Sequence, residues 1–128
     1  IMQEISPVYS LIPRLITEMK KNKDGRIIAI ASNKRFPSPA YSYNVAKNSR
    51  IEAMLGLVNP CWNNKITVNV VSPGPVDHVD SLSEAVGYVE AFPDKRTKVL
   101  PQDIAETISF LCSDKGRYIT GNVIELGF

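Results

Sequence analysis

A tyrosine and a lysine four residues apart are the side chains of this chain best suited to acid–base chemistry. They are Tyr43 and Lys47, in the segment Tyr43-Asn-Val-Ala-Lys47. On an α-helix, residues i and i+4 lie on the same face, one turn apart. A lysine ammonium beside a phenol favours the phenolate, which makes the tyrosine a usable acid or base near neutral pH. Because solvated helix faces also produce this spacing, the flanking segments decide between the two interpretations.

Two apolar runs flank this pair. Residues 26–32 precede it and end in Ser32, and residues 65–75 follow it and contain Pro73 and Gly74 at their end. Apolar residues on both faces are typical of buried parallel strands. The sequence therefore predicts strands over 26–32 and 65–72, joined by a helix over 40–58 whose first turn can accommodate Pro39.

The remaining elements follow from hydrophobic periodicity and from proline and glycine positions. Residues 1–22 have helical periodicity, but Pro7 and Pro13 predict a bent or broken helix with its better half from Tyr9 onward. We expect a short helix near 83–91, a helix over 101–112 and a strand over 122–126. This alternation is the βαβ pattern of a parallel sheet with right-handed crossovers.

A strand ending in serine, a helix carrying Tyr and Lys, and a strand ending in Pro-Gly resemble the second half of a short-chain dehydrogenase/reductase. Three later segments look like the closing segments of that family, in order: Pro101-Gln-Asp-Ile-Ala105, Phe110-Leu-Cys-Ser-Asp114 and Tyr118-Ile-Thr-Gly-Asn-Val-Ile124. The resemblance covers essentially the whole chain. It implies an α/β fold, a partial Rossmann-like, doubly wound parallel sheet of about three strands with flanking helices.

The family's Gly-rich turn, which binds the cofactor pyrophosphate, has no match among the seven glycines. The simplest account is that the first four strands are absent and that residues 1–128 form the C-terminal part of a single domain. The strand at 26–32 would then become an exposed apolar edge.

The resemblance implies a role for each matching residue. Ser32 would hydrogen-bond the substrate carbonyl or hydroxyl, Tyr43 would be the general acid in reduction and base in oxidation, and Lys47 would bind the nicotinamide ribose. The cofactor, NAD or NADP, would contact Tyr43, Lys47 and the turn formed by Pro73, Gly74, Pro75 and Val76. The implied function is an NAD(P)-dependent oxidoreductase that interconverts a carbonyl and a secondary alcohol of a small molecule.

The chain departs from the family pattern at several positions. Ser32 and Tyr43 are slightly closer in sequence than is usual, and Asp77-His78 replaces a threonine that touches the cofactor. Glu4 stands where the family often has an asparagine that holds a proton-relay water. The chain closes with Leu126-Gly-Phe where Val-Asp-Gly-Gly is usual.

Two other functions remain open. Halohydrin dehalogenases, which are lyases without a cofactor, resemble this family but use Ser, Tyr and Arg, so Lys47 argues against that assignment. A truncated, non-catalytic relative that survives as an oligomer or interaction module would fit the missing phosphate-binding half. The resemblance also implies a homodimer or homotetramer that packs through the helices over 5–22 and 40–58.

Composition excludes several other classes. A net charge of +2 gives no sign of nucleic-acid binding, and the cluster Lys20, Lys21, Lys23 and Arg26 fits a helix C-terminus. His78 is the single histidine, so we expect no metal site. No apolar run reaches about 18 residues and the first residues lack a signal-peptide pattern. Cys61 and Cys112 lie beside apolar residues, which predicts buried free thiols and a cytoplasmic protein.

Overall fold

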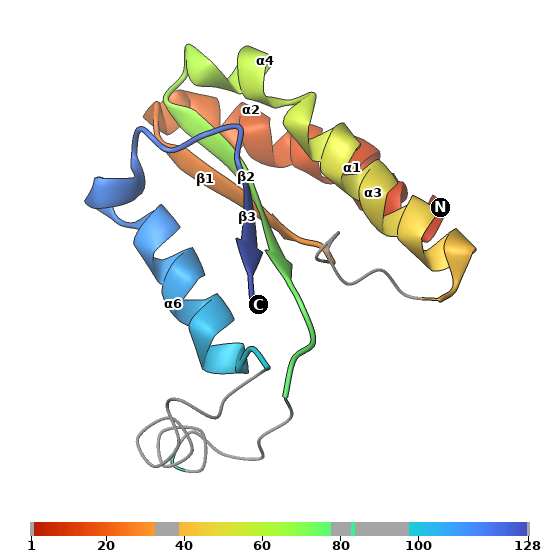
Figure 1. Cartoon of the computed structure of the whole chain (residues 1–128). Helices are drawn as coiled ribbons and strands as arrows, with labels where there is room; N and C mark the ends of the chain where they lie inside the picture. The colour runs from red at the N-terminus through yellow and green to blue at the C-terminus, as the bar shows by residue number, and fades with distance from the viewer. Residues whose placement is uncertain (1, 33–38, 78–82, 84–97, 128) are drawn as a thin grey trace.

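Three parallel strands form the centre of the part of the chain that the structure describes. The computed structural model describes residues 2–32, 39–77, 83 and 98–127. The strands are β1 (Gly25–Ile30), β2 (Ile66–Pro73) and β3 (Val123–Leu126), in the order β1-β2-β3 (Figure 1). The predicted α/β class and parallel sheet are confirmed.

The strand register places the carboxyl ends of the strands at one edge of the sheet. β1 pairs with β2 from Gly25 opposite Ile66 to Ile30 opposite Val71. The ladder continues one step beyond β1, since the Ala31 N–H donates to the Val71 carbonyl at 2.9 Å. The residues that directly follow β1 and β2 therefore emerge side by side.

A broken helix precedes β1. α1 (Met2–Ser10) contains Pro7, and α2 (Ile12–Asn22) has Pro13 in its first turn. The break predicted from these prolines is confirmed and falls at Leu11, although the segment before Tyr9 is helical too. α2 ends at Lys23, which adopts a left-handed conformation (φ 48°).

The elements after β1 follow the prediction with small shifts. α3 (Tyr41–Leu55) ends at Gly56 and is followed by the short helix α4 (Val58–Trp62), so the predicted helix over 40–58 is divided in two. α6 (Pro101–Cys112) has the predicted bounds, and a 3₁₀ turn, η2 (Asp114–Gly116), follows it. The helix predicted near 83–91 lies outside the described residues apart from Ser83, and His78 lies outside them as well.

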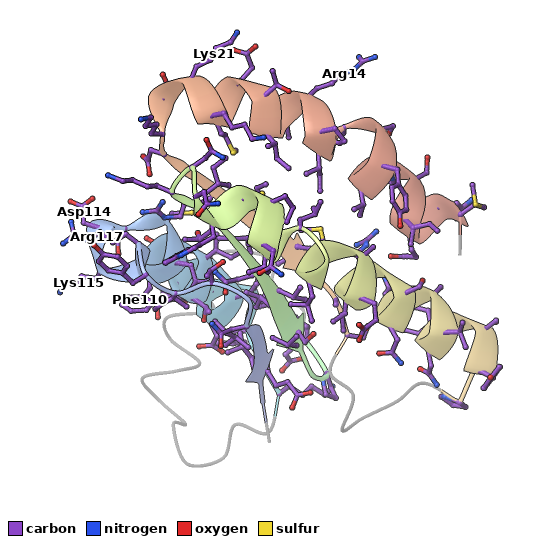
Figure 2. All side chains as sticks on the ribbon, turned by 90° about the horizontal axis from the view of Figure 1, so that it is seen from above. Arg14, Lys21, Phe110, Asp114, Lys115 and Arg117 are labelled. Atoms are coloured by element: carbon purple, nitrogen blue, oxygen red, sulfur yellow. The ribbon has the colours of Figure 1, made fainter. Side chains whose placement is uncertain are left out.

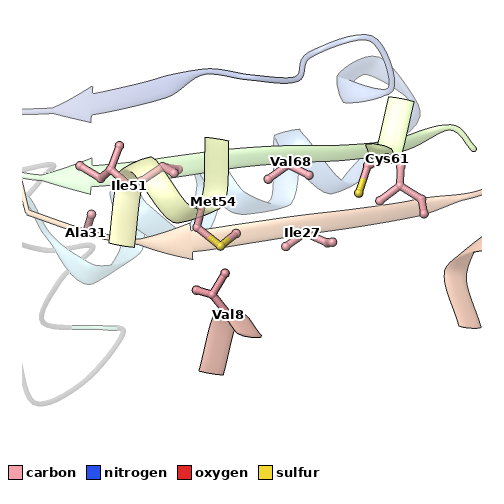
Figure 3. Close-up of a cluster of buried hydrophobic side chains, with 9 residues drawn as sticks. Val8, Ile27, Ala31, Ile51, Met54, Cys61 and Val68 are labelled. Carbon is pink, nitrogen blue, oxygen red and sulfur yellow. The ribbon is translucent and has the colours of Figure 1, made fainter. Parts of the chain in front are cut away.

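The main core lies between β1, β2 and the helices α1, α3 and α4. Figure 3 shows side chains from these elements converging on one another. Its fully or almost fully buried members are Val8, Ile27, Ala31, Ile51, Met54, Cys61, Ile66, Val68 and Val70. α6 lies against the opposite face of the sheet and buries Leu111 (Figure 1). The predicted doubly wound arrangement is therefore present.

The buried side chain of Asn69 in β2 is hydrogen-bonded to the segment before β3, whereas the buried Ser72 hydroxyl of the same strand has no hydrogen-bond partner within the described residues. The Asn69 amide donates to the Ile119 carbonyl at 2.8 Å and accepts from the Asn122 N–H at 3.2 Å. The Val68 N–H donates to the Thr120 hydroxyl at 3.0 Å. Because unpaired buried polar groups are costly, these bonds fix the segment before β3 against β2.

Within β1 only Ile27 is buried and Ile30 is exposed, because β1 is the edge strand of the described sheet. The strand is therefore not buried on both faces, and the expectation of an exposed apolar edge is confirmed. The prediction of burial is wrong for one of the two cysteines. Cys61 is buried as expected, whereas Cys112 is exposed because the end of α6 turns it to solvent. Burial raises the pKa of the Cys61 thiol, and the charge of Lys20 opposes this only in part.

The surface of α2 carries charged side chains directed into solvent. Figure 2 shows Arg14 and Lys21 pointing away from the sheet. Lys21 pairs with Glu18 at 2.9 Å, and both side chains are well exposed. Arg26 pairs with Asp24 at 2.9 Å. Two members of the basic cluster thus have local carboxylate partners.

Two absences hold for the part of the chain that the structure describes. No helix there combines the length and apolar character needed to cross a membrane. No group of three or more His, Cys, Asp or Glu side chains there is arranged to hold a metal ion.

Candidate active site

Ser32 and Tyr43 form the centre of the candidate site. Ser32 follows the carboxyl end of β1, and Tyr43 lies in the first turn of α3. Their side-chain oxygens are 3.0 Å apart, and either hydroxyl can be the donor. The fold therefore brings together the serine and the tyrosine that the sequence singled out.

Lys47 lies one turn further along α3. Its Nζ is 5.5 Å from the centroid of the Tyr43 ring, within reach of a cation–π interaction. Tyr43 is 44% exposed, whereas its neighbour Tyr41 is 81% exposed. Of these two tyrosines, Tyr43 thus has both the serine and the lysine beside it.

A carboxylate from α1 meets the lysine from the other side. Glu4 Oε1 is 3.1 Å from Lys47 Nζ, and Glu4 Oε2 is 2.7 Å from a terminal nitrogen of Arg50. All three side chains are largely shielded from solvent. Glu4, noted in the sequence as a departure from the family pattern, is therefore in direct contact with the candidate site.

Arg50 is the residue that sequence reasoning missed. Besides its ion pair with Glu4, its Nε donates to the Glu4 backbone carbonyl at 3.2 Å and its Nη1 donates to the Ile30 carbonyl at 3.1 Å. It thereby ties α3 to both α1 and the end of β1. Its spacing of three residues from Lys47, which places both on one helix face, was the single signal available in the sequence.

The Pro-Gly turn lies at the same edge of the sheet. Pro73 is the last residue of β2, and the Gly74 N–H donates to the Leu126 carbonyl at 2.8 Å. Val76 forms an isolated parallel bridge with Val99. The first bond anchors the turn to β3, and the bridge anchors it to the segment just before α6. Within the described residues, no hydrogen bond or ion pair joins it to Ser32, Tyr43 or Lys47.

The donor set suits the reactive end of a nicotinamide cofactor. A partly exposed hydroxyl and an ammonium on one helix face can hydrogen-bond the two hydroxyls of a ribose, and Ser32 lies beside them. Figure 1 shows β1 and β2 leading toward this edge of the sheet. The residues present thus fit the nicotinamide end of the cofactor, while no Gly-rich turn for the pyrophosphate occurs in the sequence.

Sequence comparison places the chain among oxidoreductases. Residues 5–126 match a family model described as enoyl-(acyl carrier protein) reductase. The uncharacterized oxidoreductase YmfI of Bacillus subtilis is 30% identical over 95% of this chain and 52% of its own length. The 3-oxoacyl-(acyl-carrier-protein) reductase FabG of Rickettsia felis is 35% identical over 87% of this chain and 48% of its own length. The chain thus spans about half the length of the curated relatives it matches.

Solved structures share the fold. A putative 3-oxoacyl-reductase from Bacillus thuringiensis superposes with a TM-score of 0.77 at 28% identity, covering 96% of this chain and 50% of that one. Acetoin dehydrogenase from Enterobacter cloacae also has a TM-score of 0.77 over the same shares, but at 23% identity it supports the fold alone. With the family match over nearly its whole length, the chain belongs to the short-chain dehydrogenase/reductase family.

Proposed function

We propose that this chain carries the catalytic part of an NAD(P)-dependent oxidoreductase that interconverts a carbonyl and a secondary alcohol. The observation that carries the proposal is the 3.0 Å contact between Ser32 and Tyr43, with Lys47 one helical turn away. Residues 1–128 would form the C-terminal part of a single Rossmann-fold domain. Its sheet and helices position the reacting groups.

Tyr43 is the general acid and base of the proposed reaction. In the reducing direction, its hydroxyl gives a proton to the substrate oxygen as that oxygen becomes an alcohol, and in oxidation the phenolate takes the proton back. The cofactor supplies the hydride when it is bound. Because Tyr43 is partly exposed, a substrate oxygen can reach its hydroxyl.

Ser32 polarises the substrate carbonyl. Its hydroxyl lies within hydrogen-bond distance of Tyr43, so one substrate oxygen can contact both groups. A donor aimed at an oxygen that gains negative charge stabilises the transition state more than the ground state. Lys47 would hold a cofactor ribose hydroxyl beside Tyr43. The turn at Pro73, Gly74, Pro75 and Val76 would face the nicotinamide from the adjoining strand.

The substrate is proposed to be a small carbonyl compound or its alcohol. Relatives named as 3-oxoacyl-(acyl-carrier-protein) reductases and acetoin dehydrogenases give two concrete candidates, a 3-oxoacyl thioester and acetoin. Both contain a ketone whose reduction gives a secondary alcohol. We expect either NAD or NADP as the cofactor.

The test compares two neighbouring tyrosines in the protein at its natural length, whose mass is determined first. NADH and NADPH binding and the oxidation of each with acetoin or a 3-oxoacyl thioester are measured for wild type, Tyr43→Phe and Tyr41→Phe. We expect Tyr43→Phe to lose at least about 100-fold in kcat, the range of general acid catalysis. Tyr41→Phe, which alters an exposed side chain of the same helix, should retain activity.

Two results would contradict the proposal. One is equal activity of the Tyr43→Phe and wild-type proteins. The other is a natural protein that binds neither NADH nor NADPH, in which case the non-catalytic alternative would be favoured.

We propose further that the protein is a homodimer or homotetramer that packs through the helices over 5–22 and 40–58. α2 has no buried residue, and Tyr9, Leu11 and Leu15 are exposed apolar side chains along the broken helix. Exposed apolar surface of this kind favours association. Light scattering on the purified protein should give a mass two or four times that of one chain, and a monodisperse monomer would exclude this assembly.

A further inference from the structure

Glu4 adds a third structural element to the candidate active site. Ser32 follows β1 and both Tyr43 and Lys47 come from α3, whereas Glu4 comes from α1. Its carboxylate lies between two cations of α3, at 3.1 Å from Lys47 Nζ and 2.7 Å from Arg50. The lysine that flanks Tyr43 is therefore held on its other side by an anion from a different helix.

Arg50 fixes the position of that anion. It binds the Glu4 carboxylate, the Glu4 backbone carbonyl and the Ile30 carbonyl. Arg50 presents several donors in a planar fork, and three contacts leave its guanidinium little freedom. Ile30 is two residues before Ser32, so the same guanidinium links the lysine's partner to the strand that carries the serine.

We propose that Glu4 is a positioning residue: its carboxylate, held by Arg50, keeps the Lys47 ammonium beside Tyr43 for contact with the cofactor. The inference rests on the proposed oxidoreductase function and names a residue through which that function depends on α1. It differs from a water-holding role, because here the carboxylate touches the lysine directly.

Partial burial strengthens the attraction between the Glu4 carboxylate and the Lys47 ammonium. Glu4 and Lys47 are 19% and 22% exposed, against 69% and 65% for the surface pair Glu18–Lys21. Exposed pairs contribute little, whereas partly buried charges interact in a medium of lower polarity. Without Glu4, the cations of Lys47 and Arg50 would face each other, and the flexible lysine would move away from Tyr43.

The test uses Glu4→Gln, which keeps the shape and hydrogen-bonding capacity of the side chain but removes its charge. Cofactor Kd and kcat/KM are measured for wild type, Glu4→Gln, Lys47→Gln and the double variant, with Glu18→Gln as the matched control. We expect Glu4→Gln to raise the cofactor Kd at least about fivefold. This effect is within the range that interaction energies between two contacting residues produce. Glu18→Gln should change it less than twofold.

The double variant separates positioning from a purely structural role. If Glu4 acts through Lys47, its replacement has no further effect on cofactor Kd once Lys47 is Gln. An equal loss in both backgrounds would overturn the proposal, because it would mean that Glu4 merely joins α1 to α3. Thermal unfolding of each variant establishes that the compared proteins are folded.

A second readout does not require a cofactor. The ¹⁵N signal of the Lys47 ammonium is assigned by its loss in Lys47→Gln and followed in the other variants. We expect a signal distinct from those of exposed lysines in wild type and Glu18→Gln, and one that becomes like them in Glu4→Gln. An unchanged signal in Glu4→Gln would overturn the inference. A changed signal in a protein that binds neither NADH nor NADPH would support the pairing and overturn the oxidoreductase assignment instead.

Discussion

The Ser32 and Tyr43 side-chain oxygens lie 3.0 Å apart, between the end of β1 and the first turn of α3. Ser32 is placed by the strand, because the ladder between β1 and β2 continues through Ala31 immediately before it. Tyr43 is placed by the helix, which packs on the sheet through Ile51 and Met54. The geometry of the proposed reaction therefore depends on how the helix and strand pack together.

Removal of the Ser32 hydroxyl should slow the reaction without unfolding the protein. Ser32→Ala takes away one donor to the substrate oxygen, and loss of one such donor costs about 100- to 1,000-fold in kcat in other enzymes. Ser42→Ala, which removes a hydroxyl from an exposed position on α3, should leave kcat unchanged. Steady-state kinetics with a saturating cofactor make the comparison. Full activity in Ser32→Ala would exclude its proposed role.

Met54 should be a major contributor to stability. It is 2% exposed and packs in the core between α3 and the sheet (Figure 3). Met54→Ala should lower the free energy of unfolding by about 2–5 kcal/mol, from lost burial and a residual cavity. Met2→Ala, at a position 71% exposed, should change it by less than about 0.5 kcal/mol. Urea denaturation of both variants measures the difference, and equal midpoints would contradict the packing described here.

Gly116 should not tolerate a side chain. A Cβ at this position would lie 2.6 Å from the Leu111 carbonyl oxygen and 2.8 Å from that of Phe110, closer than real Cβ contacts. Gly116→Ala therefore requires the backbone after α6 to shift and should lower the midpoint of thermal unfolding. Gly56→Ala is the matched control, since its nearest contact would be 3.5 Å and its φ of −61° suits alanine. A similar midpoint for the two variants would argue against the close backbone approach at Gly116.

The two cysteines should differ sharply in reactivity. Thiolates react with iodoacetamide, and burial both shields the Cys61 sulfur and raises its pKa, whereas Cys112 is exposed. Mass spectrometry at neutral pH should detect rapid alkylation of Cys112 and slow alkylation of Cys61. The Cys112→Ser variant should then show only the slow reaction, and rapid modification of Cys61 in it would contradict the described core.

The raised pKa of Cys61 also gives a pH dependence of stability. The unfolded thiol ionises near pH 8.5. Because the folded thiol keeps its proton to higher pH, its contribution to stability is complete below that value and is lost as the pH rises through the folded-state pKa. The decline in unfolding midpoint above about pH 8.5 should be smaller in Cys61→Ala than in wild type. An identical decline would show that Cys61 does not contribute to it.

Local patterns predicted most of the fold. The bounds of α6 match the predicted helix over 101–112, since Pro101 marks its first turn and its apolar residues recur at helical spacing. Pro7 and Pro13 predicted the break between α1 and α2. The exposure of Cys112 could not be predicted, because exposure depends on which elements cover a residue and not on its own hydrophobicity.

The sequence by itself determined the chemistry available to this protein. The four-residue spacing of Tyr43 and Lys47 on a helix places both side chains on one face, a consequence of helical geometry that needs no tertiary contact. Only the tertiary structure decided which side chains from other elements contact that face of α3. Ser32 arrives from β1 and Glu4 from α1, and Arg50 links them through Ile30, because the packing of α1 and α3 on the sheet brings together groups that no local pattern relates.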